Sequence, residues 1–379
     1  MKRLDSAGLL GIPDPARDRL LLSALAPRAA ALAAWRQWEA LAGDREGDPV
    51  ATRWLPLIGR HLESADLSER SRRRLDEAWR GVWAANIRVW TATEPALDRL
   101  DAAGIEWILL KGAALAWTVY ESAALRAIGD VDVLVRPGAA ARAAALLETD
   151  GWRSVHHTPA SELDSLHAIN YTRVPHGALD LHQYVLRECC WPAADTGLWE
   201  RSVIATIGDR SVRVLSPADQ LLHVCVHGLR WNPVHSSHWV ADAAWIIARA
   251  DVRLDWPTLA AEAHRRDLAF QVREALALVR RVAGAIVPDG ALAALASGRR
   301  SWPARIECHV KARPLRRPGG LLLMWYDWRR LRNGRRSARA AGDVGFARYL
   351  AYSMRLPSPR ALWSRAWQLV TGLASGRPS

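Results

Sequence analysis

One segment, from Leu109 to Val135, constrains this chain more than any other. It reads LLKGAALAWTVYESAALRAIGDVDVLV, in which a short apolar run ends at Lys111, a helix-like stretch follows, and a second apolar run contains Asp130 and Asp132. Successive side chains of a strand point to opposite faces, so the two aspartates are expected on one face while the intervening valine points into a core. The segment therefore predicts a strand, a helix and a strand of an α/β unit.

The predicted aspartate pair indicates a cation site. Two neighbouring carboxylates repel each other unless a cation lies between them, and a divalent ion of the Mg²⁺ type binds carboxylate and phosphate oxygens. A third acid, Asp180, lies in the alternating segment GALDLH, with His182 on the same face. Three carboxylates on neighbouring strands are what a two-metal phosphoryl-transfer site requires. Asp130, Asp132 and Asp180 are therefore the candidate catalytic and metal-ligating residues.

The junction between the first apolar run and the helix-like stretch suits a phosphate. A glycine at such a junction, Gly112, lets backbone N–H groups approach a phosphate at the positive end of a helix. Its neighbour Lys111 is one of three lysines among 52 basic residues. A compact ammonium beside a phosphate-binding turn is one reason for keeping lysine there, and chance is the other.

These motifs together resemble the polymerase-β-like nucleotidyltransferase superfamily, and more narrowly a bacterial group of uncharacterised nucleotidyltransferases. The resemblance covers about residues 100–300. Ala113 stands where the wider superfamily usually has glycine or serine, and the spacing from the glycine to the aspartates is longer than in its minimal members. The matching pieces are Leu109-Leu110-Lys111-Gly112, Tyr120, Arg126, Gly129-Asp130-Val131-Asp132, Gly151-Trp152 and Asp180-Leu181-His182.

The resemblance implies an α/β (α+β) fold with a nucleotidyltransferase-type mixed sheet, flanking helices, and helical regions at both ends. It also implies a magnesium- or manganese-dependent enzyme whose substrate is a nucleoside triphosphate (NTP) such as ATP. The expected nucleotide-binding residues are Lys111, Gly112, Ala113 and Arg126. Nothing in the sequence identifies the acceptor, the particular nucleotide or the oligomeric state.

Composition and periodicity divide the chain into four regions. Residues 1–100 are expected to be helical, residues 101–214 form the catalytic core, and residues 215–302 form a helical domain. Expected strands of the core lie at about 105–110, 130–135, 151–156, 167–173 and 178–186. Residues 303–379 form a basic region rich in arginine and tryptophan.

The expected helical domain carries three polar residues of undecided role. A helix beginning at Ser216-Pro217 would place His223 and His227 on one face, and Asp242 follows in a second helix. These residues could form a buried polar network between helices or lie near the substrate. A zinc site is the third alternative, although the glutamate of the metalloprotease motif is absent.

The basic C-terminal region holds the entire excess of positive charge. Residues 303–379 contain 16 basic and three acidic residues, an excess of 13 that equals the net charge of the whole chain. Basic residues interleaved with aromatic ones suit an anionic partner such as nucleic acid or lipid headgroups; the alternative is a solvated helical cap. No apolar stretch predicts a transmembrane helix. The four cysteines lack paired spacing, which favours a cytoplasmic protein. Contact with a membrane surface through the basic C-terminal region is a further option.

Two other functions compete with nucleotidyl transfer. The same fold could serve a peptide- or glycan-tailoring pathway, or it could bind a nucleotide or protein partner without turnover. A pure binding module has no need for three mutually repelling acids, so intact Asp130, Asp132 and Asp180 favour an enzyme.

Overall fold

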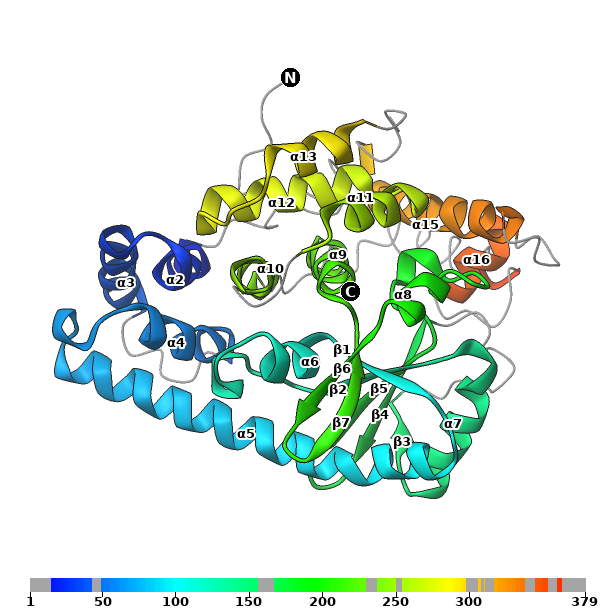
Figure 1. Ribbon diagram of the computed structural model, residues 1–379, viewed down its shortest axis with the longest axis horizontal. Coiled ribbons are helices and arrows are strands. Elements are labelled where there is room, and N and C mark those ends of the chain that lie inside the picture. The colour runs from blue at the N-terminus through cyan, green and yellow to red at the C-terminus, as the bar shows by residue number, and fades with distance from the viewer. Residues whose placement is uncertain are drawn as a thin grey trace, which may run out of the picture.

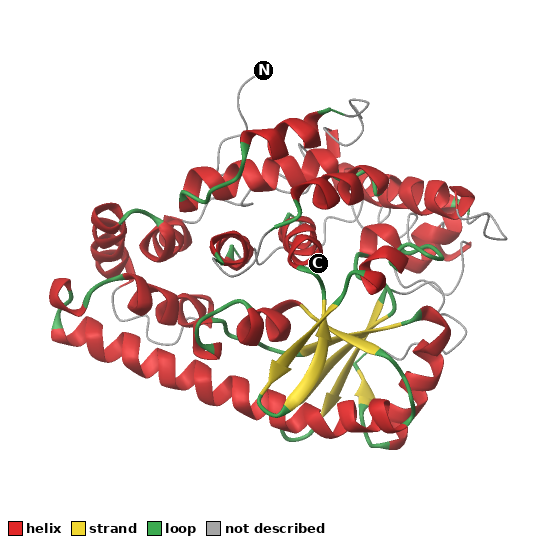
Figure 2. Ribbon diagram, viewed as in Figure 1, coloured by secondary structure: helices red, strands yellow, loops and turns green. Residues whose placement is uncertain are grey.

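The computed structural model describes residues 15–42, 49–155, 167–229, 237–249, 254–297, 306–307, 310, 317–337, 345–353 and 360–362. Helices surround one twisted sheet, which lies to one side of the molecule (Figure 2). Across these ranges no helix is both long enough and apolar enough to cross a membrane.

Residues 15–42 and 49–102 are mostly α-helical, in agreement with the helices expected in this part of the chain. The longest helix, α5, starts after the N-cap Ser68, whose side chain accepts a hydrogen bond from the Ser71 amide, and runs beneath the sheet in Figure 1. Its buried positions, from Leu75 to Leu100, recur at helical spacing along one face. The helices are α2 (Pro15–Leu25), α3 (Arg28–Ala42), α4 (Pro49–His61) and α5 (Glu69–Ala102).

The middle of the chain is built on a mixed sheet with the order β3-β4-β5-β2-β1-β7-β6. β1 pairs antiparallel with β2 and parallel with β7, and β2 pairs parallel with β5. Helices α6 (Lys111–Thr118) and α7 (Pro137–Thr149) connect the early strands. The strands are β1 (Trp107–Leu110), β2 (Val131–Val135), β3 (Arg153–Ser154), β4 (Ala168–Arg173), β5 (Gly177–His182), β6 (Val203–Ile207) and β7 (Arg210–Val214).

The expected strands form, with β3 reduced to two residues, and a further hairpin completes the sheet. β6 and β7 pair antiparallel around a turn at Gly208, which has a φ of +59°. A Gly-Asp pair between two runs of alternating apolar residues is a hairpin signal, so the sequence did contain this information. The hairpin extends the sheet beyond β1, at the edge opposite β3.

The two faces of the sheet pack against different cores. Val131 and Val133 of β2 belong to a core with α5, α6 and α7. Leu134 faces the opposite side, where a second core joins the first helices to those that follow the sheet. Because side chains alternate along a strand, Asp132 lies on the same side of the sheet as Leu134. The polar site therefore lies between the sheet and the helical part of the chain.

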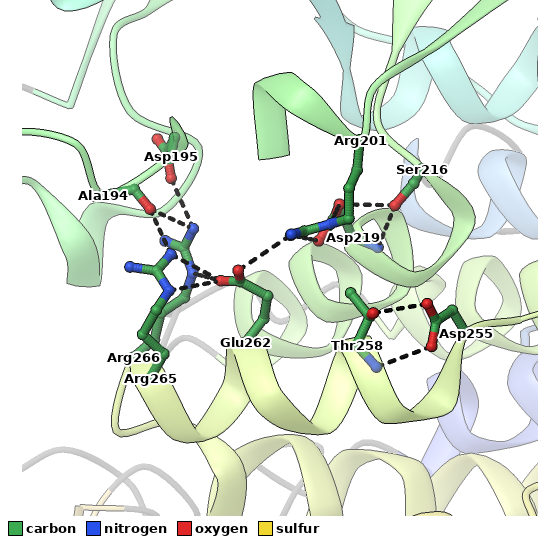
Figure 3. A network of polar contacts seen from close by, with 10 residues as sticks. All are labelled: Ala194, Asp195, Arg201, Ser216, Asp219, Asp255, Thr258, Glu262, Arg265 and Arg266. Carbon is green, nitrogen blue, oxygen red and sulfur yellow. Dashed lines mark hydrogen bonds and ion pairs between the residues drawn. The ribbon is translucent and has the colours of Figure 1, made fainter. Parts of the chain in front are cut away.

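The helices after the sheet are α8 (Thr196–Glu200), α9 (Pro217–Gly228), α10 (His238–Ala248), α11 (Trp256–Arg265), α12 (Ala269–Ala283) and α13 (Asp289–Ala296). A polar network joins α8, α9 and α11 (Figure 3). Glu262 of α11 pairs with Arg201 at 3.2 Å and with the buried Arg266 at 3.2 Å. Arg201 also pairs with Asp219, and Arg266 with Asp195. Each buried charge thus has an opposite charge beside it, which limits the cost of removing it from water.

Helices α15 (Arg317–Ser337) and α16 (Phe346–Ser353) belong to the basic C-terminal region. Arg330 is buried and forms ion pairs with Glu307 and Asp327. Burial and pairing show that part of the charge in this region is used inside the fold. Trp363 and Trp367 lie outside the described residues.

Candidate active site

Strands β2 and β5 place two of the three predicted acids beside each other. The two strands run parallel with Asp132 in register with Asp180, and His182 is in register with Leu134. Asp132 and His182 are buried, whereas Asp180 is partly accessible. The third acid, Asp130, directly precedes β2 and is also partly accessible. The acids form one cluster at the start of β2 and along β5.

One set of side chains in this cluster has the separation of metal ligands. Among the described residues, potential ligand atoms of Asp132, Asp180 and His182 lie within 4.8 Å of one another. His182 Nε2 lies 2.9 Å from Asp132 Oδ1. Asp130 is outside this set of three, although its charge raises the pKa of Asp180 and its own pKa is raised by the charge of Asp132.

The acids resist ionisation. Burial and then the negative charges of Asp132 and Asp130 raise the pKa of Asp180 to about 7. Burial and then the charge of Asp132 raise the pKa of Asp130 to about 6. The pKa of Asp132 is also raised, by burial, while Lys111 opposes the shift. Such a cluster is stabilised by added positive charge, which is the electrostatic requirement for a cation site.

Lys111 contacts the cluster from the junction of β1 and α6. Its Nζ donates to Asp132 Oδ1 at 2.5 Å. Its backbone has a φ of +47°, a left-handed conformation that costs free energy for a residue with a side chain. Strained backbone of this kind concentrates at functional sites. The unusual conformation thus belongs to Lys111, and not to the glycine that follows it.

Gly112 and Ala113 occupy the first turn of α6. A Cβ at Gly112 would meet Ile128 at 3.4 Å and the Arg126 guanidinium at 3.7 Å, which are ordinary contacts. The protein's own packing therefore does not require glycine here. Ala113 is buried, so only its backbone is available to a ligand.

Arg126, expected at the phosphates, is engaged by the helical part of the chain. Its Nε and Nη2 donate to the two oxygens of Asp242 on α10, at 2.7 and 3.0 Å. The Tyr120 hydroxyl donates to the same carboxylate at 2.7 Å. This group, in which Tyr120 and Asp242 are buried, ties α10 to the part of the chain that carries the sheet. Arg126 still lowers the pKa of Asp130 through its charge.

The two histidines of α9 differ in their surroundings. His223 is buried and His227 is exposed, with their ring centroids 6.0 Å apart. Neither belongs to a three-residue group suited to a metal within the described part of the chain. Asp242 is bound to Arg126 and Tyr120. The geometry gives no support to the zinc alternative.

Two residues near the acids were missed by sequence reasoning. Asn170 of β4 donates from Nδ2 to Asp180 Oδ1 at 2.5 Å, and Arg53 of α4 lowers the pKa of Asp130 by its charge. Asn170 is in register with Asp180, so a correct pairing of β4 with β5 would have revealed it. Arg53 is one of many arginines in the first helices, and no local pattern distinguishes it.

Comparison with known proteins agrees with the resemblance noted in the sequence. A family model described as "Uncharacterised nucleotidyltransferase" matches residues 50–284. The chain belongs to this family. A crystal structure of an antigenic nucleotidyltransferase-like protein from Paracoccidioides brasiliensis matches at 18% identity and a TM-score of 0.36, over 55% of this chain and 92% of that chain. The comparison with curated proteins gave no match.

Proposed function

We propose that this family member is a metal-dependent nucleotidyltransferase that transfers a nucleoside monophosphate from an NTP to an acceptor hydroxyl or phosphate. The observation that carries the proposal is the cluster of Asp130, Asp132 and Asp180 on and beside two paired strands, where burial and mutual repulsion raise the pKa values and a bound cation would relieve that repulsion. The carboxylate donor set also fits the divalent metal, Mg²⁺ or Mn²⁺, that such chemistry uses.

Asp130, Asp132 and Asp180 would hold the metal. When bound, the ion would neutralise the phosphates and lower the pKa of the acceptor hydroxyl. As an alternative to the ligand role, Asp180 is the candidate general base, since the pKa of its carboxyl is raised to about 7 in the metal-free cluster. Asn170, which donates to Asp180, orients that carboxyl.

Cationic residues of the site would bind the triphosphate. Lys111 and the first backbone N–H groups of α6, at Gly112 and Ala113, form one side of the proposed phosphate site. Arg126 supplies positive charge while its hydrogen bonds hold Asp242, so we assign it a positioning role. Arg53 is a further cation near Asp130. Charge neutralisation of this kind stabilises the pyrophosphate as it leaves.

The basic C-terminal region is the proposed contact for an anionic acceptor or partner. Its excess charge supports this assignment, even though Arg330 is used internally. His227 is the more accessible of the two α9 histidines and the better candidate for substrate contact. We propose that the protein acts in the cytoplasm.

Transfer of a labelled nucleotide tests the proposal. Wild-type protein would be incubated with each α-³²P-labelled NTP, Mg²⁺ or Mn²⁺, and a metabolite extract, and products would be separated and analysed by mass spectrometry. A labelled product that disappears with Asp132→Asn is expected. If no NTP gives a metal-dependent product or releases pyrophosphate, the proposal of an active transferase is wrong, and the non-catalytic binding alternative gains support.

A further inference from the structure

His182 adds an imidazole nitrogen to the acid cluster. Its side chain is fully buried on β5, two residues beyond Asp180, and shares a face of the sheet with both Asp132 and Asp180. A nucleotide bound over an open cluster could not easily reach a side chain with 0% exposure. Its ring nitrogen instead points at Asp132, which is the most buried of the acids.

The spacing of the nitrogen fits a shared cation. Metal bonds to nitrogen and oxygen ligands are about 2.1 Å long, so two ligands at right angles around one ion lie about 3.0 Å apart. His182 Nε2 and Asp132 Oδ1 are separated by 2.9 Å. Asp180 supplies the third potential ligand, because one ligand atom from each of the three side chains lies within 4.8 Å of the others. Bringing all three onto one ion requires small side-chain adjustments and the movement of the Lys111 ammonium, which lies 2.5 Å from Asp132 Oδ1.

We propose that His182 is a metal ligand together with Asp132 and Asp180, and that this nitrogen-containing set binds a divalent transition metal such as Mn²⁺ in preference to Mg²⁺. The inference rests on the proposed function and deepens it, because it assigns the kind of metal to the same site. Mg²⁺ is bound almost entirely by oxygen ligands, whereas the divalent first-row transition metals also accept imidazole nitrogen, and Mn²⁺, the weakest binder of that series, shares with Mg²⁺ an affinity for carboxylates. In this arrangement the ion bound by His182 does not need Asp130, which lies at the partly accessible end of the cluster and, together with Asp132, would hold the nucleotide-bound ion of the proposed function.

A competing role for His182 is a hydrogen bond alone. If Nε2 carries a proton and donates it to Asp132, the histidine orients that carboxylate and never touches the ion. The two roles differ in a measurable way, because only a direct ligand places its nitrogen in strong magnetic coupling with a bound Mn²⁺ ion.

Pulsed electron paramagnetic resonance of the full-length protein loaded with Mn²⁺ alone separates the two roles. We expect a directly bonded nitrogen whose signal changes when the protein is labelled with ¹⁵N-histidine. This measurement needs no substitution, so it does not depend on whether a variant at a buried position folds. Titration calorimetry should show Mn²⁺ binding at least about tenfold tighter than Mg²⁺, a difference of about 1.4 kcal/mol.

Variants locate the nitrogen. His182→Gln should abolish the nitrogen coupling and bring the Mn²⁺ and Mg²⁺ affinities closer together, with thermal melting used to verify folding. His264→Gln is the matched control, because this histidine bonds to the Ala294 carbonyl on α13 and lies outside the ligand set, so the coupling should persist. Mn²⁺ bound without nitrogen coupling in the wild type would overturn the inference. If that same protein still transfers nucleotide in a metal-dependent reaction, the proposed function remains valid. If nitrogen coupling is seen but no nucleotide is transferred, the ligand assignment holds and only the proposed function is wrong.

Discussion

Replacing Asp180 by asparagine should stabilise the metal-free protein at alkaline pH. The pKa of Asp180 is raised from 3.8 to about 7, primarily by burial and then by Asp132 and Asp130. The folded state therefore binds a proton more tightly than the unfolded state. Ionising this carboxyl costs stability progressively as pH rises from about 4 to about 7, and the full cost persists above that range.

The size of the effect follows from the pKa shift. About three pKa units correspond to a ceiling of about 4 kcal/mol. Because Asp130 and Asp132 share the cost and their own protonation adjusts, we expect about 2–4 kcal/mol of stabilisation at pH 8 and a clearly smaller effect at pH 5. Asparagine keeps an oxygen that can accept the hydrogen bond from Asn170, so packing should change little.

Thermal melting in the presence of a chelator, at pH 5 and pH 8, measures this effect. Asp209→Asn is the control for simple loss of one negative charge, since Asp209 is exposed in the β6–β7 turn. Added Mn²⁺ should raise the melting temperature of the wild type more than that of Asp180→Asn, because only the wild type keeps the full ligand set. Equal melting temperatures for wild type and Asp180→Asn at pH 8 would refute the electrostatic reasoning.

Three further predictions concern the groups around the acids and the basic region. Lys111→Ala should weaken NTP binding about ten- to a hundredfold, because one charge-assisted phosphate contact is lost, and should leave binding of the metal alone undiminished, because a cation that repels the metal is also lost. Lys111→Arg should restore NTP binding only in part. If calorimetry finds the NTP affinity of Lys111→Ala unchanged, Lys111 has a structural role instead. Asp242→Ala should cost about 3 kcal/mol of stability by leaving Arg126 without its partner, and an unchanged melting temperature would contradict this. Arg330→Gln should destabilise the fold, because Glu307 would lose its buried partner. The double variant Arg329→Gln, Arg336→Gln should instead fold normally and bind a polyanion more weakly, with a shallower dependence of the affinity on salt concentration. A folded double variant that binds the polyanion like the wild type would exclude a role for these two charges.

The strands that carry the acid cluster could be predicted because their residue pattern is local in sequence. Alternation around Asp132 and Asp180 fixes which side chains share a face, and parallel pairing of β2 with β5 then brings them together. The motif LLKG predicts the turn at which Lys111 lies. The left-handed backbone conformation of Lys111 could not be predicted from the sequence, because lysine rarely adopts that conformation.

Long-range partners could not be predicted in the same way. Asn170 reaches Asp180 only because β4 pairs with β5, and Arg53 approaches Asp130 from a helix far earlier in the chain. Arg126 is expected from the sequence to bind phosphate, and the structure pairs it with Asp242, which lies 116 positions away in the sequence. The burial of Arg330 could not be predicted either. A run of arginines is typical of a solvent-exposed surface, and only the tertiary packing determines which of them is buried.

Metal-dependent binding of an NTP by the acid cluster is the central claim, and calorimetry tests it most directly. Wild-type protein and the double variant Asp130→Asn, Asp132→Asn would be titrated with NTP in the presence of Mn²⁺, Mg²⁺ or a chelator. We predict binding by the wild type only when a divalent ion is present, and loss of that binding in a folded double variant. Full-strength metal–NTP binding by the double variant would contradict the account.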